Sequence, residues 1–366
     1  MATTAAPALR FTRVPHPAPA TAQVRAEVLA NPGFGTKFSD HMVSIEWTEA
    51  EGWHKAEILP YGPIALDPAA AVLHYAQEIF EGLKAYRLAD GGIALFRPEA
   101  NAARFNASAR RLAMAEIPED LFVQAVEQLV LTDADWFPTV EGGSLYLRPF
   151  MFASEAFLGV RPAKAYRFMV IASPAGNYFK SGSPAVSIWV SDYTRAAPGG
   201  TGAAKCGGNY AASLVPTAEA FARGHDQVLF LDAAEHKWIE ELGGMNLFFA
   251  FDDGSILTPP LSGTILPGIT RESLIALARE EGLTVREERY SLDQWRADAA
   301  SGKLVETFAC GTAAVVTPVG KVADHNGEFV IGSGGPGQLT QKLRQRLVSI
   351  QRGEAEDTHG WVRKIA

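Results

Sequence analysis

The sequence predicts an α+β protein of two domains. Its 366 residues suggest two domains of ordinary size, and 47% of them are hydrophobic, so each domain can bury a core. Stretches with alternating apolar residues, typical of strands, are interspersed with amphipathic helical stretches. They lack the regular strand–helix alternation of a doubly wound parallel sheet, so we expect meandering strands with helices packed against them.

Composition excludes several classes of protein. The net charge of −8 argues against a nucleic-acid-binding protein, which would show a basic surplus. No apolar run is long enough for a membrane-spanning helix, so no membrane association is expected. Two cysteines, Cys206 and Cys310, make no disulfide framework and favour a reducing compartment, the cytoplasm.

The first 30 residues are expected to form a flexible segment. Arginines without acidic residues near the start are compatible with a transit peptide, but prolines at 7, 15, 17 and 19 would break an amphipathic helix. We therefore favour a disordered or loosely docked tail over residues 1–30.

The first domain is predicted over residues 31–175. Helical spacing of apolar residues predicts helices over 69–81, 98–114 and 119–136, and alternation predicts strands over 83–87, 93–96, 144–149 and 167–173. Arg104 and Arg111 share one face of the second helix, which indicates either a solvated basic face or an anion site that uses Arg104. Proline and glycine in residues 176–186 predict a linker.

The second domain is predicted over residues 187–366. Strands are expected at 186–190, 227–231, 238–242, 246–251 and 305–308. Helices are expected over 209–223, with an interruption at Pro216, and over 270–281 and 338–352. The eight histidines and two cysteines show no metal-binding spacing, so no metal centre is predicted.

A glycine-rich stretch, residues 199–210, surrounds the single amine of Lys205. It does not fit the nucleotide-binding P-loop, because Ala204 stands where the second glycine belongs and Cys206 where the Ser or Thr belongs. Two interpretations remain, a flexible surface turn and a nucleophilic lysine that requires partners elsewhere in the chain.

A lysine that forms a Schiff base with a phosphorylated aldehyde cofactor needs phosphate donors, a carboxylate for the ring nitrogen and a donor to the phenolic oxygen. Gly268-Ile269-Thr270 at a helix start and the turn Gly311-Thr312-Ala313 are candidate phosphate donors. Glu240 and Glu241 follow each other on a strand and point to opposite faces, so only one of them can enter a site. Tyr210 is the candidate phenol.

These residues occur together with further motifs, and the chain as a whole resembles the branched-chain amino acid aminotransferases, which are fold-type IV pyridoxal-phosphate enzymes. The resemblance extends from about Gly33 to Trp361. It rests on segments 77–85, 145–149, 158–160, 202–210, 241–248, 266–271 and 311–313.

The resemblance implies a smaller N-terminal α/β domain, a larger C-terminal domain with a barrel-like sheet, pyridoxal 5'-phosphate at the domain interface, and a homodimer. It implies that Lys205 is the Schiff-base lysine, that Glu241 pairs with the pyridine nitrogen and that Tyr210 contacts the phenolic oxygen. The phosphate would be held by Arg104, Ile269, Thr270 and Thr312.

The implied substrates are L-leucine, L-isoleucine and L-valine with 2-oxoglutarate as the amino acceptor. The resemblance assigns the substrate pocket to Tyr75, Phe80, Tyr146, Arg148, Val160, Tyr178, Gly244, Thr312 and Ala313. Gly244 replaces a threonine found in some members, so its contact must come from backbone or water. D-amino acid aminotransferase and aminodeoxychorismate lyase, which share the fold, are the alternatives, and Arg148 argues against both.

Overall fold

The computed structural model describes residues 9–176 and 185–366. They divide into two compact units, of which the first comprises residues up to 177 together with Arg363–Ala366 and the second comprises residues 178–362. No pattern in the sequence indicates that the last four residues return to the first unit.

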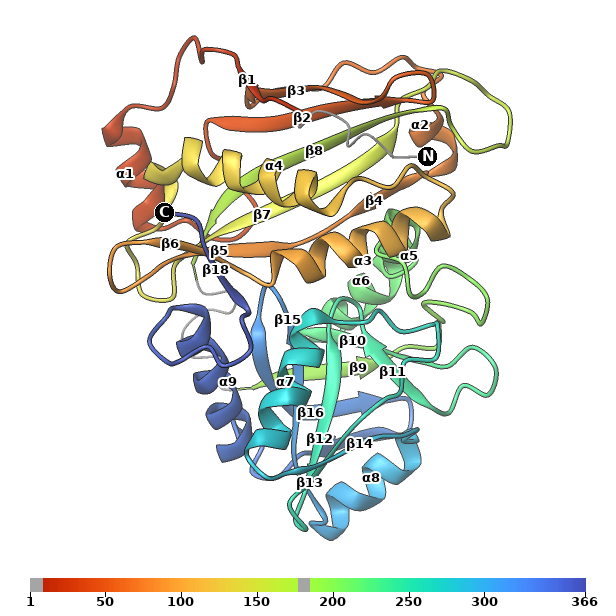
Figure 1. The fold of residues 1–366 in the computed structure, drawn as a ribbon. Coiled ribbons are helices and arrows are strands. Elements are labelled where there is room, and N and C mark those ends of the chain that lie inside the picture. Colours follow the sequence, from red (N-terminus) through yellow and green to blue (C-terminus); the bar gives the residue numbers. More distant parts are fainter. Residues whose placement is uncertain (1–8, 177–184) are drawn as a thin grey trace, which may run out of the picture. The chain divides into compact units, whose positions relative to one another are not determined.

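The first unit is built on a mixed sheet that has nine strands among the described residues (Figure 1). Its order is β1-β3-β2-β8-β7-β5-β6-β18, and β4 also pairs with β7. The strands are β1 (Thr12–Arg13), β2 (His41–Thr48), β3 (Gly52–Pro60), β4 (Glu78–Phe80), β5 (Leu83–Arg87), β6 (Ile93–Phe96), β7 (Ser144–Ala153), β8 (Ala165–Ala175) and β18 (Val362–Lys364).

The helices of the first unit are α1 (Ala22–Ala30), α2 (Ala71–Tyr75), α3 (Pro98–Arg111), α4 (Glu119–Thr132) and a short 3-10 turn at Ala134–Trp136. Helix α4 packs on β2 and β8. Three fully buried rings, those of Phe105, Phe122 and Phe168, join α3, α4 and β8 with centroids 5.3–5.6 Å apart. This aromatic cluster is part of the core that the two helices form with the sheet.

One predicted helix of this unit is wrong. Residues 69–81 form only the short helix α2, which ends at Ala76 in the left-handed conformation, and then strand β4. Ile79, which fits the helical pattern, is fully buried in β4 and lies opposite Met151 of β7. Pairing with β7 therefore overrides the helical spacing of the apolar residues.

The segment before the first domain contains regular structure in its described part. Helix α1 begins after Thr21, whose hydroxyl accepts a hydrogen bond from Val24 N. All four prolines of this segment precede the helix. Their helix-breaking effect therefore does not extend to residues 22–30.

The second unit is built on another mixed sheet, with nine strands among the described residues, in the order β11-β10-β9-β16-β15-β12-β13-β14 and with β17 paired to β16 (Figure 1). The strands are β9 (Val186–Val190), β10 (Gln227–Leu231), β11 (Ile239–Leu242), β12 (Asn246–Phe251), β13 (Ser255–Thr258), β14 (Thr284–Glu287), β15 (Leu304–Gly311), β16 (Val315–Asp324) and β17 (Gly327–Val330). The helices are α5 (Gly207–Ala211), α6 (Leu214–Ala222), α7 (Ile269–Glu280), α8 (Leu292–Ser301) and α9 (Gln338–Gln351).

The core of the second unit lies between its sheet and helix α8, where the fully buried Trp295 packs edge-on against Phe249. Helices α7 and α9 pack on each other and on β15. Two sheets with helices packed against them confirm the α+β class. No helix in the described ranges has the length and apolar character needed to cross a membrane.

Candidate active site

The glycine-rich stretch brings Lys205 and Tyr210 together. Lys205 directly precedes Cys206 and the short helix α5, which contains Tyr210. Lys205 Nζ donates a hydrogen bond of 2.7 Å to the Tyr210 hydroxyl and lies 4.9 Å from the centre of its ring. The amine is therefore held by a phenol from the same local segment.

The loop that carries Lys205 is fixed rather than a free surface turn. Asn209 Nδ2 donates to Thr201 O and Ala204 O, at 2.7 and 2.8 Å, and Asn209 Oδ1 accepts from the Thr201 hydroxyl. Gly202 packs so tightly that an added Cβ would overlap Thr264 O and would lie 2.7 Å from Ala196 Cβ. The surface-turn interpretation of this stretch is wrong.

Of the two consecutive acids on β11, Glu241 is the one that faces this loop. Its side chain is buried, with the residue 3% exposed, and one carboxylate oxygen, Oε1, accepts from Leu266 N at 3.0 Å and forms an ion pair with Arg195. Burial raises the pKa of Glu241 to about 7, although the charges of Arg195 and Lys205 and the hydrogen bond from Leu266 act in the opposite direction. Arg195, which pairs with Glu241, also donates to Gly202 O, and this arginine therefore connects the carboxylate to the loop that carries Lys205.

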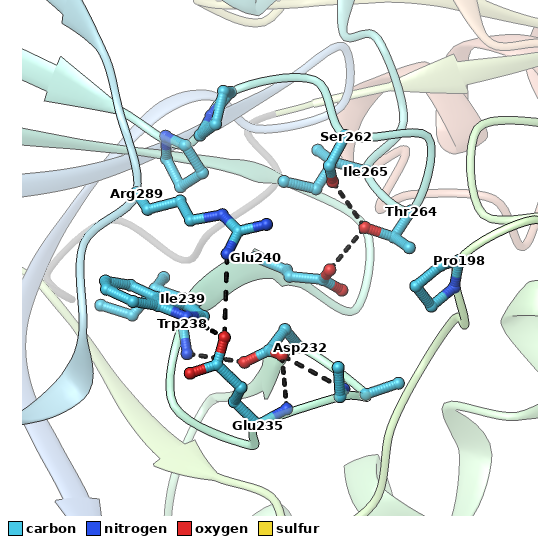
Figure 2. A pocket seen from close by; sticks show the side chains of 14 residues that line it. Pro198, Asp232, Glu235, Trp238, Ile239, Glu240, Ser262, Thr264, Ile265 and Arg289 are labelled. Carbon is cyan, nitrogen blue, oxygen red and sulfur yellow. Dashed lines mark hydrogen bonds and ion pairs between the residues drawn. The ribbon is translucent and has the colours of Figure 1, made fainter.

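Glu240 points to a different pocket (Figure 2). There its Oε1 accepts a hydrogen bond from the Thr264 hydroxyl, which lies 2.7 Å from Ser262 Oγ. Oε2 is buried and has no hydrogen-bond partner among the described residues, and burial raises the pKa of Glu240. The alternation of side chains along a strand thus separates the two carboxylates.

The two predicted phosphate-binding turns lie at the same end of the second sheet as Glu241. Helix α7 begins at Ile269 after Gly268, where a Cβ would overlap Asn246 Oδ1. The amide of Asn246 donates to Leu266 O at 3.1 Å and, more weakly, to Glu241 Oε2 at 3.4 Å.

The register of β12 with β15 places the second turn beside the first. Asn246 pairs with Cys310, so the turn containing Thr312 and Ala313 lies at this end of the sheet. Gly244, in the turn between β11 and β12, is next to it, since a Cβ on Gly311 would lie 3.4 Å from Gly244 O. Asn246, which pairs with Cys310 and contacts both Leu266 O and Glu241, therefore lies between the two predicted turns and the buried carboxylate.

The first unit groups four other predicted residues. The Arg148 guanidinium lies over the Phe80 ring at 4.8 Å and donates to the Tyr146 hydroxyl at 3.0 Å. A Cβ on Gly82 would overlap the same hydroxyl. The neighbouring Glu81, which is fully buried, accepts two hydrogen bonds from Arg104, at 2.7 and 2.8 Å.

Two pocket candidates lie outside this group, and a third falls outside the described residues. The Tyr75 hydroxyl donates to Leu158 O, and Val160 is 88% exposed. Within the described ranges neither residue has a hydrogen bond or ring contact with Arg148. Tyr178 belongs to residues 177–184 and is not described.

Sequence reasoning missed Arg195 and Asn209, which hold the loop of Lys205 and the Glu241 carboxylate in the second unit, and Glu81, which holds Arg104 in the first unit. Asn209 and Glu81 each stand inside a segment that carries the resemblance, and a buried polar side chain next to a functional residue is the signal that could have indicated them. Arg195 precedes the glycine-rich stretch, and no local pattern indicates its role.

A loop amine held by a phenol, with a buried carboxyl group on β11 connected to the same loop through Arg195, is suited to chemistry on carbonyl or amino groups. The family described as amino-transferase class IV matches residues 78–322. This chain belongs to that family.

Named relatives agree with this assignment. A branched-chain-amino-acid aminotransferase of Mycolicibacterium smegmatis is 57% identical over 98% of both chains, and the branched-chain-amino-acid transaminase 1 of Bacillus subtilis is 47% identical over 91% of this chain and 94% of its own. Among solved structures, the Escherichia coli branched-chain amino acid aminotransferase superposes with a TM-score of 0.74, at 29% identity, over 88% of this chain and 100% of its own. The branched-chain aminotransferase of the thermophilic archaeon Thermoproteus uzoniensis, solved with norvaline, gives 0.73, at 25% identity, over 88% and 100%.

Proposed function

We propose that this chain is a branched-chain amino acid aminotransferase that transfers the amino group of L-leucine, L-isoleucine or L-valine to 2-oxoglutarate with pyridoxal 5'-phosphate as cofactor. The observation that carries the proposal is the pairing of Lys205 with Tyr210 beside the buried Glu241, in a chain 57% identical to a curated enzyme of that name. The reaction gives branched-chain 2-oxo acids and L-glutamate.

The residues of the second unit fit this cofactor. The buried Glu241 carboxyl group suits a protonated ring nitrogen, because opposite charges interact strongly where water is excluded. The first turn of α7 and the turn at Thr312 are suited to a phosphate, since backbone N–H groups and the helix dipole favour an anion there. Gly268 and Gly311 let the backbone approach a ligand closely.

When bound, the cofactor supplies an aldehyde carbon for the amine and a protonated ring that accepts electrons from the substrate α-carbon. In this proposal Lys205 Nζ holds the cofactor and moves the α-proton, and Tyr210 orients that amine through its 2.7 Å hydrogen bond. Glu241 keeps the ring nitrogen protonated. Ile269, Thr270 and Thr312 hold the phosphate, and we also assign Arg104 to the phosphate on the strength of the family resemblance.

Substrate selection is assigned to residues of both units. Phe80 and Tyr146 offer the apolar surface that a branched side chain needs, and Arg148 offers a cation for the second carboxylate of glutamate. Arg148 Nε is buried without a hydrogen-bond partner among the described residues, which leaves donor capacity for such an anion. Thr312 and Ala313, with Gly244, are assigned to the substrate α-carboxylate, and Tyr75, Val160 and Tyr178 to the pocket on the resemblance alone.

A homodimer in the cytoplasm completes the proposal. Sedimentation of the purified protein tests the first part, and a sedimenting mass near 39.3 kDa, that of one chain, would contradict it. Fractionation of the source cells tests the second part.

The test of the reaction is spectroscopic. Purified protein with pyridoxal 5'-phosphate should absorb in the visible, and L-leucine without an oxo acid should shift that band to the near-ultraviolet. Lys205→Ala is the control and should lose the band of the covalent adduct. A shift with D-alanine but not with L-leucine would indicate the D-amino acid branch, and no visible band in the wild-type protein would refute the proposal.

A further inference from the structure

Arg195 is a buried arginine that no part of the proposed reaction uses. Its side chain is 4% exposed, and it follows β9 in the approach to the glycine-rich loop. Its Nη2 lies 3.1 Å from Gly202 O and 2.7 Å from Thr264 O, and the same nitrogen forms the ion pair with Glu241. The two N–H groups of Nη2 therefore face three acceptors, Gly202 O, Thr264 O and Glu241 Oε1, which all lie close to this one nitrogen.

These contacts connect the loop of Lys205 with the carboxylate of Glu241, the two groups that the proposed reaction needs at a fixed relative position. Gly202 lies three residues before Lys205, on the loop that Asn209 fixes. Thr264 belongs to the segment that also supplies Leu266 N to Glu241. A single guanidinium therefore links the loop of the lysine, the segment before helix α7 and the buried carboxylate.

The charged groups around Glu241 favour an arginine at position 195 over other polar residues. Three ionisable groups affect it: Arg195 from the preceding loop, Lys205 from the glycine-rich loop, and Glu240 from the same strand. Glu240 opposes ionisation of Glu241, whereas the two cations favour it, and Arg195 has the larger influence. Lys205 takes part in proton transfer, so its charge changes during the reaction, while an arginine stays charged at every working pH.

We propose that Arg195 is a positioning residue that keeps the Glu241 carboxylate charged and fixes it relative to the loop carrying Lys205. The inference rests on the proposed function, because Glu241 matters only if a ring nitrogen faces it. A neutral side chain at 195 should let Glu241 retain its proton and leave the cofactor ring without its counter-charge. A lysine should preserve the charge but lose most of the contacts to the two carbonyl oxygens.

The test is a double-mutant cycle on cofactor affinity with Arg195→Gln, Glu241→Gln and the double variant, each titrated as apoprotein with pyridoxal 5'-phosphate. Without Arg195 the buried Glu241 should keep its proton and offer no charge to the ring nitrogen, so we expect Arg195→Gln alone to weaken binding by about tenfold or more. In the Glu241→Gln background the same change should weaken binding less than about twofold, because Arg195 acts through Glu241. Arg195→Lys should recover part of the loss.

A second readout separates positioning from general stability. The stability of the apoprotein is measured against pH for Arg195→Gln and for a matched buried arginine, Arg271→Gln, whose side chain contacts Pro259 O and Glu287 at 3.0 and 2.9 Å. Stability falls with rising pH until the buried Glu241 has ionised in the folded protein, and the curve then becomes level. Arg195→Gln should raise the pH at which Glu241 ionises, so the stability of this variant should continue to fall above the pH at which the wild-type curve becomes level. Arg271→Gln should lower stability evenly across that range.

The outcomes distinguish this inference from the proposed function. If wild-type protein shows no visible band with pyridoxal phosphate, the proposed function fails. If wild-type protein binds the cofactor and Arg195→Gln weakens binding equally in both backgrounds, or leaves it unchanged, the role of Arg195 is refuted while the function stands. Should Arg195→Gln fail to fold, Arg195→Lys in both Glu241 backgrounds gives the same comparison.

Discussion

Replacing Gly202 with alanine should displace the loop that carries Lys205. An added Cβ would overlap Thr264 O and would lie 2.7 Å from both Thr264 Cα and Ala196 Cβ, whereas ordinary contact begins at 3.4 Å. The backbone at Thr264, the side chain of Ala196 or the loop itself must then move by about 0.7 Å or more. Gly202 has no left-handed torsion angle, so the expected effect comes from space alone.

Overpacking of this kind costs about 1–3 kcal/mol, which for a unit of this size lowers the unfolding temperature by about 2–12 °C. The effect on turnover should be larger in proportion, because a misplacement of about 1 Å near a reacting group can reduce the rate roughly a hundredfold. Thermal unfolding and leucine-dependent formation of glutamate measure the two effects on the same preparation.

Gly208→Ala is the matched control. Gly208 lies in α5 within the same stretch, and an added Cβ there would meet nothing within 4 Å. Alanine is favoured over glycine in a helix by about 0.5–1 kcal/mol, so stability should stay level or rise. If Gly202→Ala resembles Gly208→Ala in both assays, the loop is not clamped against Thr264 and the account of how Lys205 is held fails.

Three other changes give distinct results. Arg148→Met should raise the KM for glutamate much more than the KM for leucine, because the guanidinium over Phe80 is the cation offered to the second carboxylate. Glu241→Gln should cut turnover about a hundredfold or more with cofactor still bound, as expected when a buried charge acts on the reacting system. The stability of the apoprotein should fall by roughly 3 kcal/mol from Glu241 alone as pH rises from about 4.5 to about 7. Over this range the carboxyl group, whose pKa is raised, must ionise in a buried site. Glu241→Gln should remove this loss. Deleting residues 363–366 should destabilise the first unit by about 1–3 kcal/mol, since it removes the backbone bonds to Ile93 and the ion pairs of Arg363.

Each of these has an outcome that contradicts it. Equal changes in both KM values would remove Arg148 from glutamate recognition, and near-normal turnover of Glu241→Gln would mean that another carboxylate serves the ring. The pH prediction fails if the wild-type and Glu241→Gln apoproteins have parallel stability curves. The deletion prediction fails if the unfolding midpoint of the shortened chain equals that of the full chain.

Local patterns in the sequence were sufficient where the structure depends on neighbouring residues. Strands β10 and β12 have the predicted bounds, because alternation and flanking turns define them. Lys205 and Tyr210 are five residues apart on one continuous segment, so their contact follows from a short loop and one helical turn. Alternation along β11 likewise shows that only one of Glu240 and Glu241 can face the lysine.

Other features depend on contacts between distant segments and had no local signal. Arg195 is held by Thr264 O, which lies 69 residues further along the chain. Strand β4 carries apolar residues at helical spacing, and only its pairing with β7 decides between helix and strand. The bidentate hydrogen bonds from Arg104 to Glu81 also join residues 23 positions apart.

The return of the C-terminus to the first sheet affects the order in which the chain can fold during synthesis. The first unit is synthesised before the second, yet β6 gains its partner β18 only after residues 362–364, at the end of the second unit, have been made. Until then one side of β6 is an open edge, and the backbone N–H of Ile93 lacks its acceptor, Ala366 O. Open edges pair readily with other chains, so β18 has a protective function as well as a stabilising one, because it covers this edge of the first sheet.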